Sequence, residues 1–286
     1  MNCTLIKKSC VGLLAIILST SCADLTENLT GQPTVDKFFQ TLTDFNSYIT
    51  GAYTPLILLY GTDMPYAASA GAEDVNTPVI RWKGFEQVNI NTVGNPDEVT
   101  DELWNSYTSI SACNTLIKII GENTKLSPDE LSPIGGEAHF LRAFNYFQLV
   151  RWFGEVPLLT EDNQDNAAKE PQASVARIYE QIVSDLKNAE LTLPLSQDDP
   201  SRPSRWAAKA LLAKVYLTMA GFPLNETSCY ALARDKANEV ISEKVYTLEK
   251  VYSQLWLWSN RKINSEFIFA LYASSDNATG SYIHQA

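Results

Sequence analysis

The sequence has few of the residues on which catalysis and nucleic-acid binding usually depend. Only two of its 286 residues are histidines, and 22 lysines and arginines stand against 33 aspartates and glutamates. A net charge of −11 repels phosphate backbones, and no basic cluster offsets it, so we expect no nucleic-acid partner. No H-E-x-x-H, glycine-rich phosphate loop or G-x-S-x-G motif is present. We therefore expect no enzyme, no cofactor and no metal site, although abundant carboxylates leave a glycosidase pair open on counts alone.

Long hydrophobic runs are also scarce. The apolar run at 11–19 follows two lysines and is shorter than the roughly 20 residues that a membrane span needs. Small residues then lead directly to Cys22, an arrangement that resembles a bacterial lipobox. We predict that 1–21 is a lipoprotein signal peptide, that Cys22 carries the lipid, and that 22–34 is a tether. An ordinary cleaved signal with an incidental cysteine is the alternative.

Cysteine is rare in the remaining chain. Of five cysteines, two belong to the predicted signal and one is the predicted anchor, which leaves Cys113 and Cys229. Both lie in apolar helical contexts, so we expect buried thiols, and a disulfide between them stays open in an oxidising compartment.

Helical periodicity marks residues 35–53 and most of the chain after position 100. Ser174 fits an N-cap, and the apolar residues that follow it recur at helical spacing. The stretch 265–273 is instead apolar and rich in β-formers, and a short strand is expected near 79–82. Helices are predicted at 35–53, 101–121, within 136–159, and at 174–194, 202–221 and 229–244.

One predicted helix, within 136–159, carries aromatic residues on nearly every side. Its polar residues recur every third position from His139 to Arg151, a row that drifts by about 60° per step on an α-helix. No single face of this helix can therefore remain exposed to solvent, and neighbouring helices must cover the helix on both sides. We expect His139 to be a packed or surface residue, and Glu137 and Arg142 to form a structural ion pair or helix cap.

The segment 55–100 lacks a helical period and is rich in glycine, proline, asparagine and aspartate. Loops of this length are usually functional or disordered, and the aromatic residues in this one argue against disorder. Flat aromatic faces and polar side chains suit sugar rings and their hydroxyls. If Trp82 packs against the helices instead, the site is absent. The candidate ligand-binding residues are Tyr66, Asp74, Asn76, Arg81 and Trp82.

An internal repeat supports stacked helix pairs. Ala143 and Tyr146 recur 70 positions later as Ala213 and Tyr216, and each long helix precedes a shorter amphipathic one. Seventy residues is about twice the 34-residue period of tetratricopeptide helix pairs. The sequence thus predicts a mainly α fold, a tetratricopeptide-like helix-pair array over 35–286 with a loop-rich insert at about 55–100 and little β-structure.

Five ordered motifs resemble the SusD/RagB family of outer-membrane nutrient-binding lipoproteins. They are "LWNSYTSISACNTLI", "GEAHFLRAFNYFQLVRWFGEVPLL", "IYEQIVSDLKNAELTLP", "SRPSRWAAKALLAKVYL" and "SEFIFAL". Members are usually several hundred residues longer, so the chain resembles the N-terminal part of a member or a short member.

The resemblance implies a lipid-anchored, surface-exposed protein of the outer membrane that is not an enzyme. It would capture oligosaccharides and pass them to a SusC-like TonB-dependent transporter. A helical-repeat adaptor without ligand, and the same transport role with peptide cargo, are the alternatives.

Overall fold

A computed structural model describes residues 35–61, 72, 104–197, 199–260 and 264–271. By its internal contacts the chain divides into one unit up to Phe39 and a second from Gln40 onward. The first contributes the short helix α2 (Val35–Phe38), and the second contains the remaining described elements. The predicted signal peptide 1–21 and tether 22–34 lie outside the described residues.

The single helix predicted over 35–53 is wrong, because α2 ends at Phe38 and α3 spans Leu42–Gly51. Thr41 starts α3 with a reciprocal cap, in which its hydroxyl accepts from the Asp44 N–H and its own N–H donates to the Asp44 carboxylate at 2.7 Å. This cap satisfies two backbone donors that a continuing helix would have used differently. The periodic apolar residues had obscured the local break.

The segment predicted to be irregular from residue 55 begins instead with a helix, α4 (Thr54–Gly61), so the prediction is wrong for its first residues. Its sequence is apolar all round, so it shows no amphipathic period to detect. Leu56 and Leu59 are buried, and α4 packs against α8 (Ser106–Glu122). Tertiary burial thus explains a helix that periodicity could not reveal.

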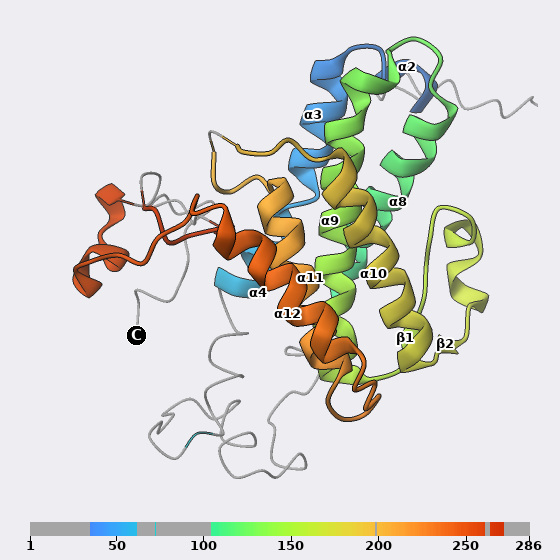
Figure 1. Cartoon of the computed structure of the whole chain (residues 1–286). Helices are drawn as coiled ribbons and strands as arrows, with labels where there is room; N and C mark the ends of the chain where they lie inside the picture. The colour runs from blue at the N-terminus through green and yellow to red at the C-terminus, as the bar shows by residue number, and fades with distance from the viewer. Residues whose placement is uncertain (1–34, 62–71, 73–103, 198, 261–263, 272–286) are drawn as a thin grey trace, which may run out of the picture. The chain divides into compact units, whose positions relative to one another are not determined.

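The helix α9 (Pro128–Phe153) lies between α8 and α10 (Val175–Thr192), as Figure 1 shows. Ser127 and Glu130 form its capping box, and Pro128 occupies the first turn. Its polar residues Glu137, Arg142, Asn145 and Gln148 are buried together with Phe140, Tyr146 and Phe147, whereas Trp152 at its end is exposed. The prediction that neighbours cover this helix on both sides is confirmed.

The second half of the array follows the predicted amphipathic pattern. Ser174 caps α10 through the N–H of Arg177, and the face formed by Ile178, Ile182, Leu186 and Ala189 is fully buried. Next come α11 (Arg205–Met219), capped by Ser204, and α12 (Cys229–Ser242). Each packs on the helix before it, so α9 to α12 lie side by side in chain order (Figure 1).

Gly136 allows a close approach between α9 and the end of α10. A Cβ at this position would lie 2.4 Å from Thr192 Oγ1 and 3.1 Å from the backbone N of Leu193. The hydroxyl could turn away, but the backbone could not, so a side chain at this position would separate the helices.

The described residues contain little β-structure. β1 (Val156–Pro157) pairs antiparallel with β2 (Gln172–Ala173), and the 3-10 helix η3 (Gln164–Lys169) lies between them. Two further 3-10 helices, η4 (Tyr252–Trp256) and η5 (Trp258–Asn260), follow α12. The mainly α, tetratricopeptide-like fold class is confirmed.

The stretch predicted to be β-rich forms no strand over 264–271, and its Phe269 packs edge-on against Phe140 of α9, with ring centroids 5.1 Å apart. Its apolar residues thus serve helix packing rather than sheet pairing. The strand predicted near 79–82 lies outside the described residues. No helix in the described part of the chain has the length and apolar character to cross a membrane.

Candidate functional site

The predicted ligand-binding residues Tyr66, Asp74, Asn76, Arg81 and Trp82 lie outside the described residues, as does Cys22. They remain predictions. The segment that contains them leaves the described structure after Gly61, at the end of α4. It returns at Trp104, just before α8, with Ala72 alone described in between.

A stack of aromatic rings marks the point where the chain returns. The Trp104 ring stacks on Tyr107 at 5.2 Å between centroids and on Phe153 at 5.6 Å, with interplanar angles of 17° and 20°. The Tyr107 hydroxyl donates to the carbonyl of Pro157 at 2.7 Å, and Trp104 remains 39% exposed. The stack therefore ties α8 to the end of α9 while leaving an indole at the surface.

A groove of about 580 Å³ lies beside this stack and is called here the α3/α8 groove. Tyr48 of α3 and Tyr107 of α8 contribute rings, and Gln164 of η3 contributes an amide. The other lining residues are Thr108, Ser111, Ala112, Asn114, Leu159 and Ala167. The groove thus combines two tyrosines with uncharged polar groups, the composition typical of sites for small polar ligands.

A second groove, of about 350 Å³, lies between α10 and the loop around β2. Its lining contains the acids Glu161, Asp162 and Glu170 and the base Arg177, with no aromatic residue. This groove is therefore lined in part by charged side chains, whereas the α3/α8 groove is lined by uncharged ones.

Behind the grooves, Arg142 forms the centre of a buried polar network. Its guanidinium donates to Asp185 twice, through Nε at 2.8 Å and Nη2 at 2.7 Å, and through Nη1 to Asn114 and Glu161. The Arg142 and Asp185 side chains are each 1% exposed. Such a bidentate pair fixes the geometry of both side chains.

His139 joins the same network, with Nδ1 2.8 Å from Asp185 Oδ1 and a side chain that is 19% exposed. Gln181 also donates to this carboxylate, at 3.2 Å. Donors from Arg142, His139 and Gln181 thus surround Asp185, an arrangement typical of a structural centre. The expectation of a packed histidine is confirmed.

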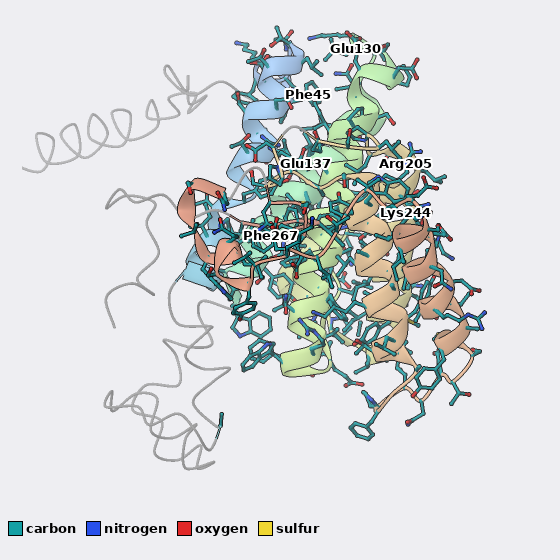
Figure 2. All side chains as sticks on the ribbon, turned by 60° about the vertical axis from the view of Figure 1, so that its left-hand side comes forward. Phe45, Glu130, Glu137, Arg205, Lys244 and Phe267 are labelled. Carbon is teal, nitrogen blue, oxygen red and sulfur yellow. The ribbon has the colours of Figure 1, made fainter. Side chains whose placement is uncertain are left out.

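Glu137 lies inside the helix array on α9, whereas Glu130 lies in the first turn of the same helix (Figure 2). The Glu137 carboxylate accepts hydrogen bonds from the Tyr53 hydroxyl and from the Arg202 guanidinium. The prediction that Glu137 and Arg142 form an ion pair or helix cap is wrong as to partners, because each pairs with a residue of another segment. Long-range packing, not spacing along one helix, selects these partners.

The two cysteines outside the predicted signal and anchor are free thiols in the described structure. Both are buried, and burial raises the pKa of the Cys113 thiol to about 12. The expectation of buried thiols is confirmed. Within the described residues, no group of three or more histidines, cysteines or acids could hold a metal ion.

The amino-acid sequence alone does not reveal the α3/α8 groove. In the sequence, Trp104 and Tyr107 belong to the first ordered motif and to the helix predicted at 101–121. In that predicted helix a spacing of three positions would bring the two rings side by side, and in the structure they stack although Trp104 lies just before α8. Tyr48 and Gln164 carried no local signal, because only the packing of α3 and η3 brings them to α8.

These features define a helix-pair array with two surface grooves. A sequence model of the SusD-like family, described as "Starch-binding associating with outer membrane", matches residues 29–217. SusD-like protein P2 of Formosa agariphila is 30% identical over 237 residues, covering 76% of this chain and 44% of that protein. The chain belongs to the SusD-like family.

Solved structures agree with this assignment. A SusD superfamily protein from Parabacteroides distasonis superposes with a TM-score of 0.72 at 30% identity, over 82% of this chain and 51% of that one. Another structure, solved with a xylogluco-oligosaccharide, shares the fold with a TM-score of 0.64 at 23% identity, over 82% and 48%. The chain thus spans about half the length of these relatives.

Proposed function

We propose that this chain is a glycan-binding lipoprotein, anchored to the outer membrane at Cys22 and exposed at the cell surface. It captures oligosaccharides and passes them to a SusC-like TonB-dependent transporter, and it catalyses no reaction. The observation that carries the proposal is the family match over 29–217, which includes all but the last of the five ordered motifs. A protein of the same fold has been solved with a xylogluco-oligosaccharide, which supports an oligosaccharide as ligand.

In this proposal the candidate residues from Tyr66 to Trp82 contact the glycan. Loops presented by a rigid helical scaffold are where binding residues concentrate. A sugar stacked on one indole, with a few hydrogen bonds, exchanges water for protein at each hydroxyl and gains little net free energy. We expect millimolar to micromolar dissociation constants, or about −4 to −8 kcal/mol.

The variant Trp82→Ala tests the binding role. Glycan arrays would identify an oligosaccharide that the purified chain binds, and calorimetry should then show that Trp82→Ala has lost detectable binding with its helical circular dichroism intact. Trp256→Ala is the matched control, because Trp256 is 72% exposed on η4 and should leave affinity unchanged. Equal affinity in Trp82→Ala would place the site elsewhere. Failure of the wild-type chain to bind any glycan would favour the adaptor or the peptide-cargo alternative.

The variant Cys22→Ser tests the anchor. Membrane fractionation should find this variant in the soluble fraction, because an acylated cysteine buries its chains at about 0.8 kcal/mol per methylene group. Labelled fatty acid that is still incorporated into Cys22→Ser would mean that another residue carries the lipid.

A further inference from the structure

We infer that the α3/α8 groove is a second carbohydrate-contact site, which takes an uncharged sugar residue. This inference rests on the proposed function and extends it, because it adds a location within the described structure and a class of sugar. The groove is built from α3, α8, Leu159 and η3, and its lining includes none of the candidate residues from Tyr66 to Trp82.

The dimensions and rings of the groove suit a sugar. Its volume of about 580 Å³ falls within the range of roughly 300 to 1,000 Å³ that is usual for small-ligand sites. Tyr48 and Tyr107 line it from two different helices. Aromatic rings provide flat apolar surfaces against which the C–H face of a pyranose can pack.

The lining also selects by charge. No residue that lines the α3/α8 groove is an acid, a lysine, an arginine or a histidine, and the polar groups are hydroxyls and amides. A carboxylated or amino sugar placed there would lose hydration without gaining a partner of opposite charge. The groove beside β2, with its three acids and Arg177, offers the contrasting environment.

One polar atom of the groove lacks a partner in the described structure. The Gln164 side-chain oxygen is buried and has no hydrogen-bond partner among the described residues, while its amide nitrogen lies 3.5 Å from Thr115 Oγ1. Buried polar atoms without partners are uncommon in folded proteins. A sugar hydroxyl in the groove can donate to this oxygen once the Gln164 side chain turns it toward the groove.

The groove is held in shape before any ligand arrives. Tyr107 is fixed by its hydrogen bond to Pro157 and by the stack with Trp104. Asn114 donates to the Leu159 carbonyl at 3.1 Å and accepts from Arg142 at 2.7 Å. Groups that are already ordered lose less conformational entropy on binding.

Two variants of the full chain test the site by calorimetry with neutral xylogluco- and malto-oligosaccharides and with acidic oligogalacturonate. Ser111 is an exposed α8 residue of the groove, and Ser111→Trp should fill the groove and weaken neutral-glycan binding at least about tenfold. Gln164→Leu should weaken it about three- to tenfold by removing the acceptor. Ser184→Trp, the same change at an exposed position on α10, is the matched control and should leave binding unchanged.

The outcomes separate this inference from the proposed function. If the wild-type chain binds none of the three glycans, both fall. If a neutral glycan binds and both groove variants retain full affinity while Trp82→Ala loses it, only the second site is overturned. Oligogalacturonate binding that Ser111→Trp abolishes would overturn the neutral class. If Ser111→Trp lowers the melting temperature, Gln164→Leu decides the question.

Discussion

Two buried carboxylates in the same helix array have pKa values that are shifted in opposite directions. Burial raises the pKa of Asp185 on α10, but hydrogen bonds from Arg142 and His139 and their charges outweigh it, and the pKa lies below its usual value of 3.8. Burial also raises the pKa of Glu137 on α9, where the charge of Arg202 and the hydrogen bonds from Tyr53 and Arg202 are insufficient, and the pKa lies above its usual 4.5.

The geometry of the arginine explains the difference. Arg142 grips Asp185 with two nitrogens, and its side chain is 1% exposed. Arg202 reaches Glu137 with one nitrogen, directs another to Thr50, and its side chain is 26% exposed. A buried bidentate contact stabilises a carboxylate more than a single contact that water screens. A buried acid thus contributes to stability only as far as its partners compensate for lost hydration.

The largest effect is expected for Asp185→Asn. This change leaves the Arg142 guanidinium buried without its bidentate partner, and removing one member of a buried pair costs about 3–5 kcal/mol. Urea denaturation at pH 7 measures the free energy of unfolding. Asp165→Asn is the matched control, since Asp165 is 78% exposed and faces Lys118 at 3.7 Å, and it should change stability by less than about 0.5 kcal/mol. Equal losses of stability in the two variants would contradict the claim that the buried pair of Asp185 and Arg142 stabilises the fold.

A smaller effect is expected for Tyr53→Phe. The hydroxyl of Tyr53 is one of two donors to Glu137, so its removal leaves a buried carboxylate with Arg202 alone. We expect a loss of about 1–2 kcal/mol in the free energy of unfolding. Tyr230→Phe, at a tyrosine that is 52% exposed, should be neutral in the same titration. A neutral Tyr53→Phe would show that the hydrogen bond contributes nothing to Glu137.

The smallest effect at pH 7 is expected for Glu137→Gln. The amide keeps the shape and accepts from Tyr53, and the loss of the Arg202 ion pair is offset by the loss of the carboxylate desolvation cost. We expect a change within about 1 kcal/mol. A destabilisation as large as that of Asp185→Asn, measured by the same urea titration, would contradict the contrast between the two acids.

The pH dependence of the two variants should differ in sign. The Asp185 contribution is fully present above about pH 4 and is lost as pH falls through its lowered folded-state pKa, so Asp185→Asn and wild type should converge in acid. Glu137 has a raised folded-state pKa, so wild type should lose stability relative to Glu137→Gln as pH rises above 4.5. Urea titrations between pH 3 and 7 would show this, and parallel curves would contradict it.

The amino-acid sequence by itself determined the helix array, because burial of a periodic face and local caps act over a few neighbouring positions. Ser174 and the face from Ile178 to Ala189 were predictable on this basis, as was the two-sided covering of α9. The ordered motifs likewise predicted the family that the comparisons show.

Only the tertiary structure decided which distant residues meet. Arg142 pairs with Asp185 and Glu137 with Arg202, across separations of 43 and 65 positions, and no local period encodes such pairs. The all-apolar α4 also depended on packing, whereas the Thr41 break is local and is encoded by the spacing of Thr41 and Asp44. One groove is lined by Tyr48, Tyr107 and Gln164 because α3, α8 and η3 pack together. The geometry of such a site depends on contacts between distant segments, and spacing along the chain does not specify those contacts.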